Sequence, residues 1–170
     1  ISAEGYHPYA QTISVGDAMP DITLYTMTGS GPESVTTGDL FGGKKVALFG
    51  LPGAFTPTCS AKHVPGFVAN HDALTAKGID SIVCVSVNDA FVMGAWGEDQ
   101  QVGDKVMMVS DGSAELALAT GLELDLSNRG FGMRCCRFSM VVNDGKVESL
   151  NLESDGGYEV TSAEHMLANL

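Results

Sequence analysis

The order of apolar and helical segments predicts one α/β domain with a central mixed β-sheet flanked by helices. Apolar runs of strand length, such as VALFGL at Val46 to Leu51, alternate with segments of helical spacing. The sequence Asn-Asp-Gly at 143–145 lies between two further apolar runs and indicates an antiparallel hairpin. At 170 residues the chain is long enough to bury its own core, and no linker or internal repeat divides it. We therefore expect residues 1–170 to form a single domain.

The strands expected before the hairpin are short apolar runs between turn-forming residues. Ile22 and Leu24 belong to a short alternating strand, and a Gly/Ser/Pro-rich turn follows at 28–32. The longer apolar runs are residues 45–51, 81–87 and 106–109. Such runs are typical of strands buried on both faces, and their alternation with helices predicts a largely parallel arrangement here.

The expected helices have apolar residues at helical spacing and recognisable end signals. They cover residues 66–77, 88–96, 114–120 and 161–167. Gly78 and Gly121 follow the first and third of these helices, where glycine is the usual terminating residue. Asn88, Ser113 and Thr161 are the expected N-caps, the last within a capping box.

The composition excludes several classes of protein. The chain carries 21 acidic and 9 basic residues, a formal net charge of −12, and its basic residues form no cluster. Such a chain is repelled by phosphate backbones, so we expect no nucleic-acid or membrane partner. With 44% hydrophobic and 18% charged residues, the composition is that of a folded globule rather than a disordered acidic chain. No apolar run approaches the roughly 18 residues of a membrane span, so we expect a soluble protein.

The four cysteines are too few and too widely spaced for a disulfide scaffold. They are Cys59, Cys84, Cys135 and Cys136. No CxxC pair exists, which excludes a zinc ribbon and a dithiol exchange motif. No other ligand spacing indicates a metal, and we expect no metal and no cofactor. Unpaired cysteines of this kind favour a reducing compartment.

The beginning of the chain is polar and aperiodic. We expect residues 1–14 to form a short N-terminal extension, an arm on the surface. The sequence opens at Ile1 without a methionine, which is compatible with the removal of a leader. The expected location is intracellular and cytoplasmic, and the alternative is a mitochondrion or another organelle after removal of a leader.

The segment from Lys44 to Phe67 places a cysteine where chemistry is favoured. A buried strand runs into a Gly/Pro turn, and Cys59 follows where a helix should begin. Backbone N–H groups and the helix dipole favour the thiolate there, which is the nucleophilic form. Thr56 lies three residues earlier, within reach of the sulfur, and Pro52 stiffens the loop. The alternative is that Cys59 is a small apolar residue packed at a helix end.

The residues around this cysteine resemble a known family. Pro52, Thr56 and Cys59 have the spacing P-x-x-x-T-x-x-C, and the string PGAFTPTCSAKHVPGF resembles the active-site segment of type II peroxiredoxins, also called peroxiredoxin five. The segments 86–96 and 137–153 extend the resemblance, which covers roughly residues 15–170. It implies a thioredoxin-like fold and thiol-dependent reduction of hydrogen peroxide and alkyl hydroperoxides.

The resemblance also implies roles for four residues. Cys59 would be the peroxidatic cysteine, whose thiolate attacks the peroxide and becomes a sulfenic acid. Thr56 would contact the peroxide oxygens, Pro52 would shield the thiolate from water, and Arg137 would supply a guanidinium. An arginine is always protonated, so it is suited to stabilising the negative charge that moves during this attack.

Other charged side chains compete for roles in the site. Arg134 and Arg129 are alternatives to Arg137, but Arg137 directly precedes the aromatic residue Phe138 as in the family, and we expect Arg134 to be a surface charge. His63 lies four residues after Cys59 and is a possible auxiliary residue on the same helix face. The alternative for His63 is a packed or solvated helix histidine.

The sulfenic acid must react with a second thiol. Cys84, which lies 25 residues after Cys59, is the possible resolving cysteine by resemblance, but its position within a buried strand favours a structural role. Cys135 and Cys136 should point to opposite sides of a strand, and a packing role is favoured for them. We therefore expect an external thiol reductant, either glutaredoxin with glutathione or thioredoxin.

Two further expectations concern assembly and an alternative function. Members of the subfamily are commonly homodimers, and the neighbourhood of Phe55 and Phe91 is the expected contact. The alternative to an enzyme is a peroxide-responsive redox sensor or a thiol-switched binding protein. In that case oxidation of Cys59 would change a partner surface and turnover would be incidental.

Overall fold

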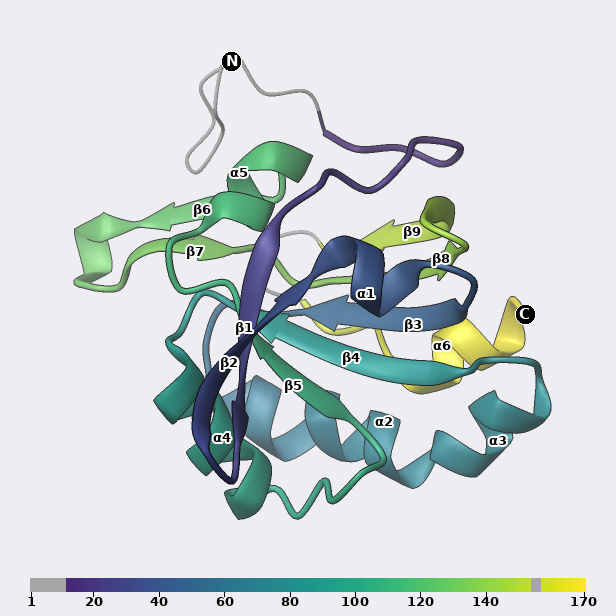
Figure 1. Cartoon of the computed structure of the whole chain (residues 1–170), viewed down its shortest axis with the longest axis horizontal. Helices are drawn as coiled ribbons and strands as arrows, with labels where there is room; N and C mark the ends of the chain where they lie inside the picture. Colours follow the sequence, from purple (N-terminus) through teal and green to yellow (C-terminus); the bar gives the residue numbers. More distant parts are fainter. Residues whose placement is uncertain (1–11, 154–156) are drawn as a thin grey trace.

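A seven-stranded mixed sheet forms the centre of the protein in a computed structural model that describes residues 12–153 and 157–170 (Figure 1). Its strand order is β2-β1-β5-β4-β3-β8-β9. These strands are β1 Thr23–Thr28, β2 Gly31–Thr36, β3 Lys45–Gly50, β4 Ser81–Ser86, β5 Met107–Ser110, β8 Phe138–Asn143 and β9 Lys146–Leu152. A separate two-stranded sheet pairs β6 Glu123–Leu126 with β7 Gly132–Cys135. The α/β class with a central mixed sheet is confirmed.

Strand directions show where the expectation of a parallel sheet holds. β3 is parallel to β4, and β4 is parallel to β5. All other neighbours in the large sheet are antiparallel, because hairpins rather than helical crossovers supply its outer strands. The expected hairpin is formed by β8 and β9, whose turn residues Asp144 and Gly145 have φ of 49° and 81°. Positive φ at both turn positions is the geometry that Asp-Gly favours.

Helices cover both faces of the sheet. They are α1 Thr37–Phe41, the π-helical turn η1 Cys59–His63, α2 Val64–Ala69, α3 His71–Ala76, α4 Ala90–Asp99, α5 Glu115–Thr120, the 3-10 turn η2 Ser127–Arg129 and α6 Ala163–Ala168. In Figure 1, α2, α3 and α4 lie below the sheet, and α1 and α5 lie above it. None of the helices in the described part of the chain is long and apolar enough to span a membrane.

The core forms two layers because strand side chains alternate between the faces of the sheet. On β3, Ala47 and Phe49 face the layer that also contains α2, α4 and α6. Val46 and Leu48 face the other layer, which contains α1 and α5. Phe49 stacks on Phe67 of α2 with ring centroids 4.1 Å apart. Burying one side chain of this size contributes about 1.5–3 kcal/mol.

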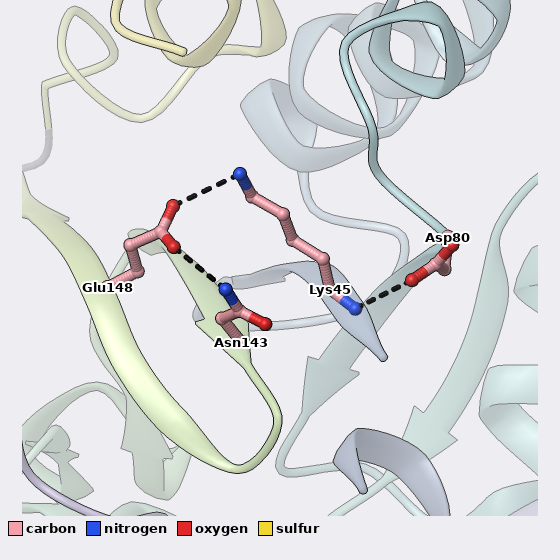
Figure 2. A network of polar contacts seen from close by, with 4 residues as sticks. All are labelled: Lys45, Asp80, Asn143 and Glu148. Carbon is pink, nitrogen blue, oxygen red and sulfur yellow. Dashed lines mark hydrogen bonds and ion pairs between the residues drawn. The ribbon is translucent and has the colours of Figure 1, made fainter. Parts of the chain in front are cut away.

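A polar network joins the amino end of β3 to its neighbours (Figure 2). The Lys45 N–H donates to Asp80 at 2.8 Å, and its ammonium pairs with Glu148 of β9 at 3.2 Å. Asn143 donates to the same Glu148 carboxylate at 3.1 Å. Because these side chains are partly exposed, the ion pair, which spans from β3 to β9 across β8, contributes only about 0–1 kcal/mol. The network lies at the end of β3 opposite to the one that leads into the Cys59 loop.

None of the three predicted N-caps takes its expected place, and two of them, Asn88 and Thr161, make other hydrogen bonds instead. Asp89, not Asn88, caps α4 by accepting from the Val92 N–H at 2.9 Å. Asn88 instead accepts from the Ala54 N–H at 3.0 Å, which holds the loop that follows β3. The third, Thr161, is also displaced: Ser162 caps α6, and the Thr161 hydroxyl donates to Glu153.

The helix α5 begins in a way that local sequence does not reveal. Ala114 precedes it with φ of 59°, so the expected capping by Ser113 does not occur. The buried carboxylate of Asp111 accepts from the N–H groups of Leu116 and Ala117 at 3.0 and 2.9 Å. Gly121 ends the helix with φ of 72°, as expected.

The expected surface arm is only partly within the described residues. Residues 1–11 lie outside them. Ile13 is 7% exposed, and its N–H donates to the Thr120 carbonyl at 2.8 Å. The end of the predicted arm at 12–14 is therefore packed on α5, because an isoleucine in this otherwise polar stretch finds apolar neighbours there.

Candidate active site

Cys59 lies in the first turn of the helix that follows the central strand β3. Residues 51–58 form the loop from the carboxyl end of β3, and the Val64 N–H donates to the Cys59 carbonyl within η1. The Cys59 side chain is fully buried. Backbone N–H groups and the helix dipole at this position favour a thiolate. The structure thus places the predicted cysteine where the sequence placed it.

Two hydrogen bonds hold the start of this helix. Trp96 of α4 is fully buried, and its indole N–H donates to the Ser60 hydroxyl at 3.0 Å. The Ser60 N–H donates to the Thr56 carbonyl at 2.9 Å. Neither bond uses the Cys59 sulfur. They hold the backbone next to Cys59 and leave the sulfur to accept from another group.

Arg137 is the charged group that contacts the sulfur. It directly precedes β8, is 8% exposed, and its Nη2 donates to the Cys59 Sγ at 3.1 Å. Its Nη1 donates to His63 Nδ1 at 2.8 Å. Two directed hydrogen bonds from one planar guanidinium define its orientation, and its fixed positive charge stabilises a thiolate. The structure therefore brings together three of the residues singled out from the sequence.

His63 is fully buried and neutral. Its Nε2 lies 2.9 Å from the Thr161 carbonyl, which can only accept, so Nε2 carries the proton and Nδ1 accepts from Arg137. Burial, followed by the positive charge of Arg137, lowers the His63 pKa to about 3. Of the alternatives raised by the sequence, the solvated helix histidine is wrong, because His63 is a packed partner of the guanidinium.

Thr56 and Pro52 lie in the half-buried part of the loop. The Thr56 hydroxyl donates to the Gly53 carbonyl at 2.7 Å. Because its one proton is engaged, Thr56 Oγ1 offers lone pairs to a donor such as a peroxide O–H. The Pro52 carbonyl accepts from Arg134 Nη1 at 3.1 Å.

Arg134 differs from its expected role as a surface charge. It lies on β7 and is half-buried, and its Nε donates to the Phe131 carbonyl at 2.9 Å. A Cβ at Gly53 would lie 2.6 Å from Arg134 Nη1, so the guanidinium is packed against the loop. This contact is tertiary, because β7 lies far from Pro52 in sequence and pairs with β6 rather than with the large sheet. Arg129, by contrast, is exposed in η2.

Asn88 is the residue of this site that sequence reasoning misassigned. Its Oδ1 accepts from both the Ala54 N–H and the Ser86 hydroxyl, at 3.0 and 2.6 Å. Its position just after β4 could have predicted this contact with the loop after β3, since the carboxyl ends of parallel strands lie at one edge of a sheet.

All four cysteines are unpaired. The three other than Cys59 have thiols whose ionisation is disfavoured by burial. Cys84 is fully buried within β4, and burial raises its pKa well above the usual range. Cys135 is buried and donates to the Leu51 carbonyl at 3.1 Å, and its pKa is raised in the same way. Cys136 is half-buried, with a pKa raised by burial to about 11. Cys135 faces the core, as expected of one of the two adjacent cysteines. Cys136, expected on the opposite side, is only partly exposed to solvent.

The fold and the site together define a thiol-based redox protein. A buried cysteine begins a helix after a central parallel strand, and a guanidinium donates to its sulfur. Among residues 12–153 and 157–170, no group of three or more His, Cys, Asp or Glu side chains is placed to hold a metal ion.

Comparison with known proteins identifies the family. Residues 14–167 match the Redoxin family. Peroxiredoxin-2E of Arabidopsis thaliana, a chloroplastic protein, is 50% identical over 167 residues, which cover 96% of this chain and 71% of that protein. Peroxiredoxin-2D of Arabidopsis thaliana is 47% identical over 159 residues, covering 93% of this chain and 98% of that protein. The chain belongs to the redoxin family and, within it, to the type II peroxiredoxins, which are thiol-dependent peroxidases.

A solved structure supports the same assignment. The crystal structure of reduced Prx3 from Vibrio vulnificus, in complex with hydrogen peroxide, has a TM-score of 0.89 and 46% identity. The match covers 93% of this chain and 99% of that chain. The thioredoxin-like fold implied by the sequence resemblance is therefore confirmed.

Proposed function

We propose that the protein reduces hydrogen peroxide and alkyl hydroperoxides, with Cys59 as the peroxidatic cysteine. The observation that carries the proposal is the 3.1 Å hydrogen bond from Arg137 Nη2 to the Cys59 Sγ. A permanently cationic donor on a sulfur stabilises the thiolate, the form that attacks an O–O bond.

In the first step the thiolate attacks one oxygen of the hydroperoxide. An S–O bond forms while the O–O bond breaks, and the electron pair leaves with the second oxygen as an alkoxide or hydroxide. That oxygen takes up a proton and departs as an alcohol or water. Cys59 is oxidised to a sulfenic acid and the peroxide is reduced by two electrons.

The loop and Arg137 supply the surroundings of this step. Negative charge moves from sulfur toward the leaving oxygen, and the preorganised guanidinium of Arg137 faces that charge without rearranging. Thr56 accepts a hydrogen bond from the peroxide O–H, since its own proton is donated to Gly53. Pro52 limits access of water to the thiolate, because it is half-buried beside Gly53 and lacks a backbone donor.

In the second half of the cycle an external thiol reduces the sulfenic acid. Its sulfur displaces water from the Cys59 sulfenic acid and forms a mixed disulfide, which a second thiol cleaves to regenerate Cys59. Glutaredoxin with glutathione, or thioredoxin, is the proposed reductant. Burial of Cys84 within β4 and its raised pKa argue against this internal thiol as the resolving group.

We extend the proposal to assembly and location. Phe55 and Phe91 are 52% and 67% exposed, and the Phe55 ring lies 6.3 Å from Trp96, which shares α4 with Phe91. Exposed aromatic side chains of this kind favour a homodimer contact on this side of α4. The unpaired cysteines support an intracellular location, in the cytoplasm or in an organelle such as the mitochondrion.

Replacement of Cys59 by serine tests the proposed function. With an added thiol reductant, the wild-type protein should consume hydrogen peroxide far faster than a free thiol does, and Cys59→Ser should lose this activity. The matched control is Cys136→Ser, which replaces a half-buried thiol and should retain it. Substantial turnover by Cys59→Ser would contradict the proposal, and a wild-type rate no faster than that of a free thiol would favour a redox sensor instead.

A further inference from the structure

A carboxylate outside the reacting groups takes an unusual number of hydrogen bonds. Glu153 follows β9, and its Oε2 accepts from three successive N–H groups, those of Glu159, Val160 and Thr161, at 2.7, 2.8 and 2.9 Å. The Thr161 hydroxyl donates to the same oxygen at 2.8 Å. Four donors on one carboxylate oxygen fix the backbone of 159–161 in a single arrangement.

The fixed backbone carries the carbonyl that holds His63. Thr161 is fully buried, and its carbonyl accepts from His63 Nε2 at 2.9 Å. This bond places the proton on Nε2 and leaves Nδ1 to accept from Arg137 at 2.8 Å. A shift of the Thr161 carbonyl would therefore tilt the imidazole and move the acceptor away from the guanidinium.

Glu153 also contacts Arg137 through the main chain. Its N–H donates to the Arg137 carbonyl at 3.1 Å. The same residue thus holds the backbone of Arg137 directly, and holds its guanidinium through Thr161 and His63. These hydrogen bonds lead from Glu153 to Arg137, whose Nη2 donates to the Cys59 Sγ at 3.1 Å.

We propose that Glu153 is a positioning residue for the peroxidase reaction, which acts through the Thr161 carbonyl and His63 to aim the Arg137 guanidinium at the Cys59 sulfur. The inference rests on the proposed roles of Cys59 and Arg137. It assigns to Glu153 and to the backbone of 159–161, which are far from Cys59 in sequence, an effect on the reactivity of that thiol.

The charge state of each member suits this arrangement. Hydrogen bonds from Thr161, Glu159 and Val160 lower the Glu153 pKa despite the opposing effect of burial, so the carboxylate is ionised at neutral pH. His63 is neutral, so it accepts from Arg137 instead of repelling it. A neutral side chain at 153 would remain able to accept, but more weakly, because hydrogen bonds to a charged acceptor are about twice as strong as those to a neutral one.

The test compares Glu153→Gln and Glu153→Ala with Glu148→Gln. Glu148 is a matched control on β9, the strand that Glu153 follows, since its carboxylate pairs with Lys45 at the other end of that strand (Figure 2). Alkylation of Cys59 by iodoacetamide is followed by mass spectrometry between pH 4 and 9, and the rate of reaction with hydrogen peroxide is measured by stopped flow. Thermal melting is recorded for each variant.

A positioning role predicts a graded response in the Cys59 readouts. In Glu153→Ala the alkylation profile should move to higher pH. The rate of reaction with peroxide should fall by about tenfold, less than the about 10²-fold that a full 1 Å misplacement can cost. In Glu153→Gln the rate of reaction with peroxide should fall by about threefold, since the amide oxygen keeps part of the hydrogen bonding. Glu148→Gln should match the wild-type protein in both readouts.

A purely structural role predicts a different result. If the Glu153 variants melt at lower temperature but keep the wild-type alkylation profile and peroxide rate, the inference is wrong. Should Glu153→Ala not fold, Glu153→Gln decides the question alone. Combining Glu153→Gln with His63→Leu adds a double-mutant cycle, in which additive effects on the peroxide rate would contradict a shared path. If the wild-type protein shows no peroxide turnover that depends on Cys59, the proposed function itself is refuted, whatever the Glu153 variants do.

Discussion

Arg137 donates through Nη2 to the Sγ of Cys59, a residue 78 positions earlier in the chain. The pairing of β8 with β3 produces this contact. In that register Gly50, the last residue of β3, lies opposite Phe138, so Arg137 lies beside the start of the loop that leads to Cys59. The Phe138 ring occupies the space that a Cβ at Gly50 would take, so only glycine fits at this position.

The geometry of the guanidinium predicts that lysine cannot replace Arg137. A single ammonium is a point charge on a flexible chain, so it cannot reproduce the two directed bonds to Cys59 and His63. We expect Arg137→Lys to slow the reaction with hydrogen peroxide by about 10²–10³-fold, the usual cost of losing one preorganised donor. Stopped-flow measurement at neutral pH gives this rate. Arg129→Lys, at an exposed arginine of η2, should react like the wild-type protein, and an Arg137→Lys rate within threefold of wild type would refute the role.

Burial of His63 predicts a loss of stability in mild acid. The folded-state pKa of about 3 lies below the ordinary value of 6.5, so between these values the unfolded chain binds a proton that the folded protein does not. The contribution of neutral His63 to stability is therefore complete above about pH 6.5 and is lost progressively as the pH falls toward 3.

Thermal melting of His63→Gln measures this effect. Glutamine does not titrate, so the melting temperature of the wild-type protein should fall more steeply between pH 7 and pH 4 than that of His63→Gln. His165→Gln, a change at a half-buried histidine of α6, is the control and should follow the wild-type curve. Parallel curves for the wild-type protein and His63→Gln would show that His63 is protonated in the folded state as readily as in the unfolded chain.

The position of Cys84 predicts turnover without an internal disulfide. Cys84 lies within β4, paired with Phe49 of β3, so a bridge to Cys59 would require the start of the helix to unwind. After one equivalent of hydrogen peroxide, non-reducing mass spectrometry should find oxidised Cys59 and no Cys59–Cys84 bridge. Cys84→Ala should keep its peroxidase activity with glutaredoxin and glutathione to within about twofold, since the substitution removes only a buried thiol. A bridged peptide in the wild-type protein would establish a two-cysteine cycle instead.

The exposed aromatic side chains predict that a charge at Phe91 prevents dimerisation. Phe91 is 67% exposed on α4, next to a hollow that Tyr25 and Pro32 also line. We expect light scattering after size exclusion to show a dimer for the wild-type protein and a monomer for Phe91→Glu, because a dimer contact would bury the new carboxylate unpaired. Leu152→Glu changes another exposed apolar residue, on β9, and should remain dimeric. A dimer that survives Phe91→Glu would place the contact elsewhere.

Local sequence signals predicted much of the fold. The apolar run of β3, the Asp-Gly turn between β8 and β9, and the glycine that ends α5 all reflect preferences of a few adjacent residues. The strands β2, β6 and β7 were not predicted, because they are short and only partly buried and so lack a clear apolar pattern.

The helix caps show the limit of such signals. Asn88 and Thr161 are good N-cap residues by type, yet Asn88 accepts from the Ala54 N–H and the Ser86 hydroxyl, and the Thr161 hydroxyl donates to Glu153. Their neighbours Asp89 and Ser162 are equally good caps and take the positions. Local preference limits the N-cap position to one of two adjacent residues, and tertiary contacts decide which of them takes it.

For the candidate active site, local sequence was enough to single out Cys59 as the proposed nucleophile. Cys59 follows a buried strand at the start of a helix, and both features are local. Three further features came from the folded structure: neutral His63 accepts from Arg137, Arg134 donates to the Pro52 carbonyl, and Glu153 accepts from the Thr161 N–H. These relationships depend on contacts between separate segments and on removal from water, and neither is encoded in a short stretch of sequence.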